Sequence, residues 1–99
     1  IRPRVSKRLT VLTAEEELRL ARAMTTWSAL VAERVPAATG ACRLAGLEAG
    51  AVIVDADAPI VAQELRLRAP ELLAAFAAAP GGMAAREIRI RVRPADRRV

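Results

Sequence analysis

Apolar residues recur at helical spacing through the first third of the chain. Positions i, i+4, i+7 and i+11 of this stretch form one stripe on a helix, and they are occupied by Leu20, Met24, Trp27 and Val31. Thr13 followed by Glu16 is a capping-box sequence, which marks a helix start. The pattern predicts a helix from Ala14 to about Arg34, with Trp27 and Met24 on its buried side.

The next apolar run alternates with a period of two and is interrupted by a turn. Residues 42–47 alternate weakly, and 51–56 form a short apolar stretch after Glu48-Ala49-Gly50. Glycine takes a positive φ angle without steric cost, so Gly50 suits a tight turn. The two runs are therefore expected to form a β-hairpin.

A second helical stripe follows, with apolar residues that share one face: Val61, Leu65, Ala69, Leu72 and Phe76. Asp57 is the expected cap, and Pro59 is tolerated in the first turn. Pro70 lies within the pattern, where proline removes a backbone hydrogen bond and clashes with the preceding turn. The helix either kinks there or breaks and restarts, and Pro80-Gly81-Gly82 ends it.

The clearest strand pattern lies near the end, at 85–93. Arg86, Ile88, Ile90 and Val92 alternate there with Glu87, Arg89, Arg91 and Arg93. The resulting order, α-β-β-α-β, predicts an α+β fold, a two-layer sandwich whose three-stranded sheet carries both helices on one face. We expect this domain to span 13–94, between a flexible basic lead-in (1–12) and a basic tail (95–99).

Composition argues against an enzyme. The 99 residues include one cysteine and no histidine, so an intramolecular disulfide, a cysteine-rich zinc site and histidine-based acid–base catalysis are excluded. Asp55 and Asp57 could hold a cation, but such a pair more often forms a turn and a helix cap. No cofactor or metal is expected. No apolar run approaches the length of a membrane span, and we expect a cytoplasmic protein.

The net charge of +5 is concentrated at the two ends of the chain. Residues 1–10 contain four basic side chains and no acidic one, whereas 11–85 carry more acidic than basic residues. Basic ends favour an anionic partner, nucleic acid above all, although the same composition could merely keep a small domain in solution. The predicted nucleic-acid contacts are Arg2, Arg4, Lys7, Arg8, Arg43, Arg89, Arg91 and Arg93.

The prediction of nucleic-acid binding rests mainly on the arginines of the last strand. Side chains two residues apart on a strand are about 6.6–7 Å apart, comparable with the phosphate spacing of an extended single strand. Arg43 of the hairpin could join the same face. The alternative is a solvated sheet face whose charges discourage edge pairing. A Gly-x-x-Gly clamp of the RNA-binding KH type is absent between the predicted helices.

Several short motifs occur in an order that resembles the DciA family. They are Trp27-Ser28-Ala29-Leu30-Val31, Gly50 to Val54, Ala62-Gln63-Glu64-Leu65-Arg66, Pro70-Glu71-Leu72-Leu73, Gly82 and Ile88 to Arg91. Val61 stands where the family commonly has Trp, and Ala32 where it commonly has Gly. The resemblance implies a KH-like domain in a bacterial replication accessory protein.

The resemblance further implies binding to a DnaB-type replicative helicase hexamer and to single-stranded DNA, hence nucleoid association. Candidate partner contacts on the second helix are Val61, Glu64, Leu67 and Arg68. Two alternatives remain open at this point: a KH-like RNA-binding or ribosome-associated module, and a purely protein-binding or self-associating domain.

Overall fold

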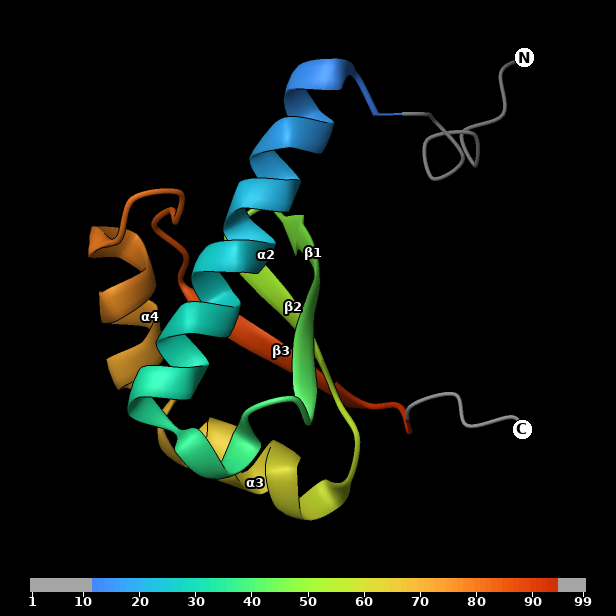
Figure 1. Cartoon of the computed structure of the whole chain (residues 1–99), viewed down its shortest axis with the longest axis vertical. Coiled ribbons are helices and arrows are strands. Elements are labelled where there is room, and N and C mark those ends of the chain that lie inside the picture. Colours follow the sequence, from blue (N-terminus) through green and yellow to red (C-terminus); the bar gives the residue numbers. More distant parts are fainter. Residues whose placement is uncertain (1–11, 95–99) are drawn as a thin grey trace.

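A computed structural model of the chain describes residues 12–94 (Figure 1). Its elements, in chain order, are α2 (Ala14–Arg34), the short 3-10 helix η1 (Pro36–Ala38), β1 (Cys42–Glu48), β2 (Ala51–Ala56), α3 (Pro59–Leu67), α4 (Ala69–Ala78) and β3 (Glu87–Val92). The predicted α+β class is confirmed, with one helix more than expected. In this part of the chain, no helix is long and apolar enough to cross a membrane.

Strand β2 lies in the middle of the sheet. It pairs with β1 in antiparallel fashion and with β3 in parallel fashion. Gly50, at a φ of +73°, turns the chain between β1 and β2, as the sequence predicts. The parallel pairing requires a long connection, which α3 and α4 supply. A bulge between Leu44 and Gly46 shifts the register of β1 and interrupts its alternation.

The core lies between the helices and one face of the sheet. Trp27 of α2 meets Phe76 of α4 edge to face, with ring centroids 6.0 Å apart and an interplanar angle of 81°. Around this pair pack the fully buried side chains Leu44, Val52, Val54, Leu65 and Leu72. The helices therefore cover one face of the sheet, as expected, and Trp27 is a core residue.

Pro70 separates two helices. Helix α3 ends at Leu67, Arg68 takes a non-helical conformation (φ −102°, ψ 10°), and α4 starts at Ala69 with the proline in its first turn. The predicted alternative of a break and restart is thus confirmed over a kink. Proline has no N–H to offer, and in the first turn that N–H would have no helical partner.

Two expectations about individual residues are wrong. Asp57 does not cap α3, because the cap position is Ala58, without a side-chain hydrogen bond, and the Asp57 carboxylate pairs with Arg43 instead. Met24 does not join the core, since its side chain is 43% exposed. The other members of the predicted stripe, Leu20, Trp27 and Val31, do face the core, and Ala23 is buried beside them in place of Met24.

Candidate nucleic-acid and partner interfaces

The predicted arginine row lies on the face of the sheet that the helices leave open. Residues paired across neighbouring strands point to the same side. Arg43 is opposite Asp55, which in turn is opposite Arg91, and Arg89 is opposite Ile53. The expectation that Arg43 shares a face with the arginines of the last strand is therefore confirmed. We call this surface the open sheet face.

Each arginine of this face already has an acidic partner. Arg89 lies 3.0 Å from Glu87 and 3.3 Å from Glu48, and Nε of Arg91 donates to Asp55 at 2.8 Å. Arg43 pairs with Asp57. Three guanidinium groups thus meet four carboxylates, so the open sheet face is not a bare basic strip. The exposed pairs of Arg89 contribute about 0–1 kcal/mol and are open to exchange with phosphate, whereas the carboxylates of Asp55 and Asp57 are partly buried.

The remaining predicted nucleic-acid contacts fall into two groups. Arg93 is exposed and makes no ion pair among residues 12–94, while its backbone N–H donates to Ala56 at 2.7 Å. The others, Arg2, Arg4, Lys7 and Arg8, lie outside the described residues. The only aromatic residues of the chain, Trp27 and Phe76, are in the core, so the open sheet face offers no platform for base stacking.

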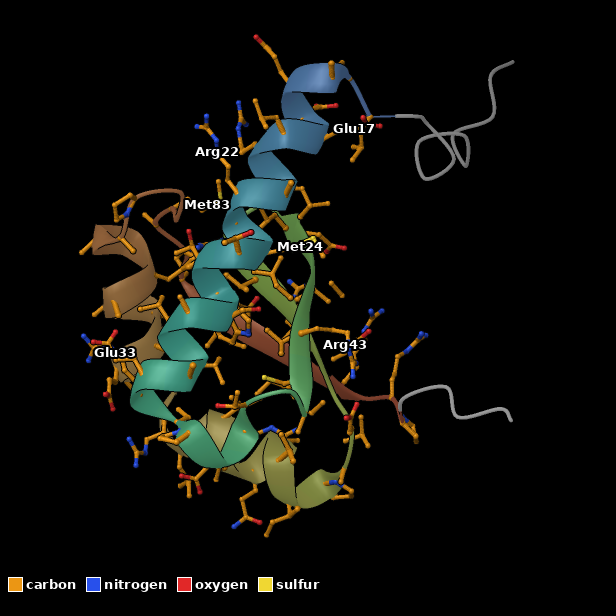
Figure 2. The ribbon with its side chains drawn as sticks, viewed as in Figure 1. Glu17, Arg22, Met24, Glu33, Arg43 and Met83 are labelled. Atoms are coloured by element: carbon orange, nitrogen blue, oxygen red, sulfur yellow. The ribbon has the colours of Figure 1, made fainter. Side chains whose placement is uncertain are left out.

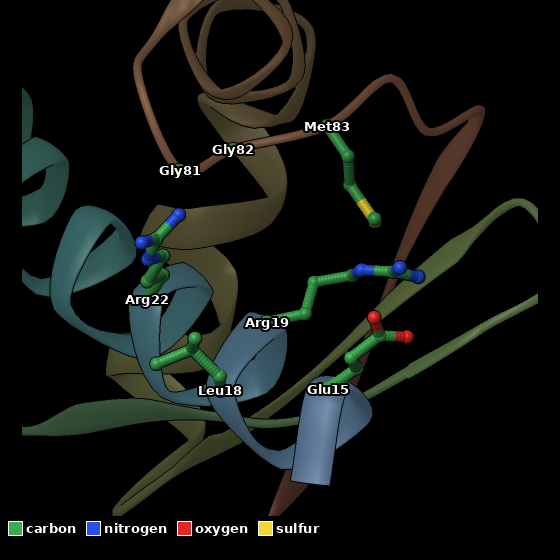
Figure 3. Close-up of a pocket in the computed structure, with 7 residues that line it drawn as sticks. All are labelled: Glu15, Leu18, Arg19, Arg22, Gly81, Gly82 and Met83. Carbon is green, nitrogen blue, oxygen red and sulfur yellow. The ribbon is translucent and has the colours of Figure 1, made fainter. Parts of the chain in front are cut away.

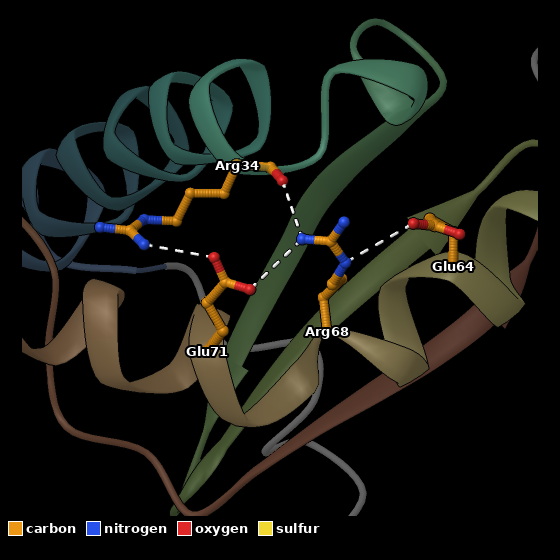
Figure 4. A network of polar contacts seen from close by, with 4 residues as sticks. All are labelled: Arg34, Glu64, Arg68 and Glu71. Atoms are coloured by element: carbon orange, nitrogen blue, oxygen red, sulfur yellow. Dashed lines mark hydrogen bonds and ion pairs between the residues drawn. The ribbon is translucent and has the colours of Figure 1, made fainter.

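Arg68, one of the predicted partner contacts, holds three elements together (Figure 4). Its guanidinium donates to the backbone carbonyl of Arg34 at 3.2 Å and lies 3.3 Å from Glu71 and 3.6 Å from Glu64. The side chain of Arg34 reaches the same Glu71 at 3.3 Å. This network ties the junction of α3 and α4 to the end of α2. It gives Arg68 a structural role that requires no contact with a partner protein.

The other predicted partner contacts divide between core and surface. Val61 is half-buried and packs against the core, whereas Leu67 is 68% exposed. Ile60 lies seven residues before Leu67 on the same side of the helix and is 72% exposed. Glu64 lies between them and lines, with Ile60, a hollow of about 120 Å³ against η1. We call Ile60, Glu64 and Leu67 the α3 outer surface.

The sequence-based prediction named Glu64 and Leu67 on the exposed side of this helix but missed Ile60. The signal was present, since an apolar residue seven positions before Leu67 repeats the helix after two turns. Arg19 and Arg22 lie off the apolar stripe predicted for the first helix. In the structure both reach from α2 toward the segment Gly81–Met83 and line a hollow there (Figure 3).

Arg22 and Met83 lie on the same side of α2, whereas Arg43 projects from β1 on the opposite side of the view (Figure 2). The hollow beside α2 is thus a surface separate from the open sheet face. Its volume is about 440 Å³, and its remaining lining residues include Glu15 and Leu18. Its lining combines side chains of both charges with the apolar Leu18 and Met83.

Cys42 does not provide a reactive thiol. Burial raises the pKa of Cys42, because the charged thiolate is poorly solvated there, and the neighbouring indole N–H of Trp27 and the charge of Arg43 offset this only in part. The thiol therefore stays protonated near neutral pH. Within residues 12–94, no group of three histidine, cysteine or acidic side chains could hold a metal ion.

Comparison with known proteins identifies a family. No curated protein matches the chain. The family described as Dna[CI] antecedent, DciA, matches residues 4–90 and so covers every element up to most of β3. This family is an accessory family associated with loading of the DnaB helicase and is not a catalytic one. Since the match spans far more than half of its length, the chain belongs to the DciA family.

Proposed function

We propose that this protein binds the hexamer of a DnaB-type replicative helicase and assists its placement on single-stranded DNA. The observation that carries the proposal is the family match over residues 4–90, which makes the protein a replication accessory factor. The cytoplasm and its nucleoid are the corresponding location. Two surfaces of the domain support the two halves of this function.

The α3 outer surface is the proposed helicase contact. Ile60 and Leu67 are the two most exposed large apolar side chains among residues 12–94. Full burial of such a side chain contributes about 1.5–3 kcal/mol, so two of them can anchor an interface. The hollow beside Ile60 gives a partner side chain a place to insert. The α3 outer surface rests on a well-packed helix, since Ala62 and Leu65 on its other side are completely buried.

Replacing Ile60 and Leu67 together with Glu should weaken helicase binding at least about tenfold, because charged side chains cannot be buried in an apolar contact. Biolayer interferometry with the immobilised helicase hexamer from the same organism measures this directly. Ala74→Glu, at an exposed position on α4, is the matched control. Unchanged affinity of the double variant, with its thermal unfolding also unchanged, would remove the α3 outer surface from the proposal.

The open sheet face and Arg93 are the proposed DNA contacts within residues 12–94. The spacing of Arg89, Arg91 and Arg93 suits consecutive phosphates, and each guanidinium can bind a phosphate with two hydrogen bonds. Because Arg89 and Arg91 are paired with carboxylates, DNA must displace these partners. The acidic side chains therefore compete with DNA.

This competition predicts that removing the arginines and removing their carboxylate partners change the affinity for DNA in opposite directions. Arg89→Ala with Arg91→Ala should weaken binding to a labelled oligo-dT strand and reduce its salt dependence, since fewer counterions are released. Glu48→Gln with Asp55→Asn should strengthen the same binding, because Arg89 and Arg91 each lose one competing carboxylate. Fluorescence anisotropy over a series of salt concentrations measures both. Equal affinity in all variants would refute this site, and tighter binding to structured RNA would favour an RNA-binding module instead.

A further inference from the structure

Strand β3 ends the sheet, and among residues 12–94 its outer edge has no neighbouring strand. The strand order is β1-β2-β3, so β3 pairs on one side alone (Figure 1). Successive residues of a strand direct their backbone groups alternately to its two sides. The N–H of Glu87 donates to the carbonyl of Gly50 at 3.2 Å, just before β2. The N–H of Arg93 donates to the carbonyl of Ala56 at 2.7 Å, at the end of β2.

Three residues of β3 direct their backbone groups away from the sheet. By the alternation, the odd-numbered residues of the strand face β2, so the N–H and C=O groups of Ile88, Ile90 and Val92 point outward. Within the described residues, no hydrogen bond reaches these groups. Since β3 keeps one register with β2 over its whole length, the three outward positions follow one another at about 6.6–7 Å. We call these three residues the β3 edge.

The opposite edge of the sheet is less suited to pairing. The register of β1 shifts between Leu44 and Gly46, and a bulge of this kind interrupts the even row of backbone groups. Helix α2 also packs along β1. Bulges and prolines are common devices that keep a strand edge from pairing. The pairing of β3 contains no bulge, and the strand contains no proline, so these devices do not protect its edge.

The side chains of the β3 edge are apolar and incompletely covered. Ile88 and Ile90 are half-buried against the core, and Val92 is 43% exposed. An added strand would place every second side chain beside them on the same face of the sheet. Its other side chains would lie next to Arg89 and Arg91, whose charges are matched by carboxylates of the same chain. The β3 edge therefore favours alternating apolar residues and selects no particular charge.

The backbone groups and the length of the β3 edge decide between possible occupants. Each of its residues presents a donor and an acceptor side by side, which another peptide backbone matches, whereas phosphate groups offer acceptors alone. The strand has six residues and so extends about 20 Å. Such a narrow contact is far smaller than the roughly 800 Å² per partner of a stable interface between two folded domains. An extended peptide segment fits the edge better than a second copy of the domain.

We propose that the β3 edge binds an extended segment of a partner protein, which joins the sheet as a fourth strand. The backbone of the segment pairs with Ile88, Ile90 and Val92, and its alternate apolar side chains lie beside theirs on the face that carries the helices. In strand addition of this kind, backbone hydrogen bonds provide affinity and alternate side chains provide specificity. The β3 edge shares no residue with the α3 outer surface, so this proposal does not depend on the proposed helicase contact.

Amide hydrogen exchange of the whole chain, followed residue by residue by NMR, tests whether the edge is available. The N–H groups of Arg89 and Arg91 face β2 and should exchange slowly. Those of Ile88, Ile90 and Val92 should exchange at least about tenfold faster, because they have no partner in the sheet. Slow exchange at all five residues would mean that another part of the chain, or a second copy, already pairs with the edge, and would overturn the proposal.

Selection from a random library of ten-residue peptides displayed on phage, with the whole chain as bait, supplies a probe. The enriched peptides should carry β-branched or aromatic residues at alternate positions and lack proline. A synthetic peptide of the enriched sequence should slow the exchange of the three outward N–H groups of the β3 edge. No enrichment, protection at other residues instead, or the same protection by an oligo-dT strand would each overturn the proposal.

Val92→Pro removes one outward N–H and no hydrogen bond to β2, so thermal unfolding should be preserved. This variant should bind the peptide at least about tenfold more weakly, because it loses a hydrogen bond and its ring obstructs the added strand. Val92→Thr is the matched control, since it keeps the N–H and a β-branched side chain, and its affinity should stay within about twofold. Unchanged affinity of Val92→Pro, or an equal loss with Val92→Thr, would overturn the proposal.

Methylation of the peptide backbone tests the same contact without any change to the protein. In an added strand, every second N–H of the peptide faces β3 and the others face solvent. Methylating one set of alternate N–H groups should therefore abolish binding at least about tenfold more strongly than methylating the other set. Equal effects of the two methylation patterns would show that the peptide does not bind as a strand and would overturn the proposal.

Discussion

Gly82 lies so close to α4 that a side chain has no room. A Cβ atom at this position would overlap the backbone carbonyl of Phe76, whose ring lies in the core. Gly82→Ala should therefore lower the free energy of unfolding by about 1–3 kcal/mol, the usual cost of overpacking. Urea-induced unfolding followed by tryptophan fluorescence measures the change, because the only tryptophan, Trp27, packs against Phe76.

Gly46→Ala is the control for this prediction. A Cβ atom at Gly46 meets only a side-chain atom of Ile53, at 4.0 Å, which is an ordinary contact. Alanine is also favoured over glycine within a strand by roughly 0.5–1 kcal/mol. The two substitutions should thus change stability in opposite directions. Equal effects would mean that the segment around Gly82 relaxes to accommodate a methyl group.

Residue by residue, the sequence predicts what depends on local pattern. Trp27 in the core and Gly50 at the turn follow from spacing and backbone chemistry, and both are confirmed. Asp57 was expected to cap a helix, a local preference, but its partner Arg43 is on another strand. Met24 was expected in the core because it lies on the stripe, whereas the small Ala23 is buried there and Met24 lies at the exposed edge. Both errors arise from tertiary contacts.

Among the elements, α2 depends most on its cap. The hydroxyl of Thr13 accepts from the N–H of Glu16 at 3.1 Å, and the carboxylate of Glu16 accepts from the N–H of Thr13. Residues 14–19 are exposed, and of the next three only Leu20 packs against the core, so loss of the cap should fray that half alone. Thr13→Ala should speed amide hydrogen exchange over residues 17–22 about fivefold, corresponding to about 1 kcal/mol. Exchange at Trp27 and Val31 should barely change.

Thr25→Ala separates the cap from a general effect of removing a hydroxyl. The hydroxyl of Thr25 donates to the carbonyl of Ala21 within the same helix at 3.2 Å, a bond that the helix does not need. This variant should leave exchange over residues 17–22 unchanged or slower. Faster exchange throughout α2 after Thr13→Ala would show that the helix unfolds as one unit with the core.

Element boundaries vary in how well the sequence predicts them. Helix α2 begins and ends at the expected residues, because the capping box and Pro36 are local signals. Proline chemistry limits the second helical region to a kink or a break, and the structure selects the break. The bulge in β1 could not be foreseen, since it depends on how that strand aligns with β2. The hydrophobic period of an element, and the prolines and glycines that end it, can be recognised from neighbouring residues. The register between two strands depends on residues far apart in the sequence.

Across the whole molecule, the sequence predicts where the arginines lie but not what they contact. The alternation of the last strand places Arg89 and Arg91 on one face, as observed. Asp55, however, is 36 positions from Arg91, and only the parallel register brings their side chains together at 2.8 Å. The same holds for the hollow of about 440 Å³ beside α2, which forms because residues 81–83 return to the first helix. Surfaces formed by residues that are distant in the sequence can be recognised only once the fold is known.

The parallel pairing of β2 with β3 also sets an order of events. During synthesis β2 can pair with β1 as soon as the hairpin emerges, but its other edge has no partner until Glu87–Val92 follows. All four residues from Ala51 to Val54 are buried in the finished domain. Until the last strand arrives, this apolar run presents an unpaired backbone edge, the feature that promotes intermolecular strand pairing and aggregation. Pairing with β3 therefore removes the strand edge through which one newly made chain could aggregate with another.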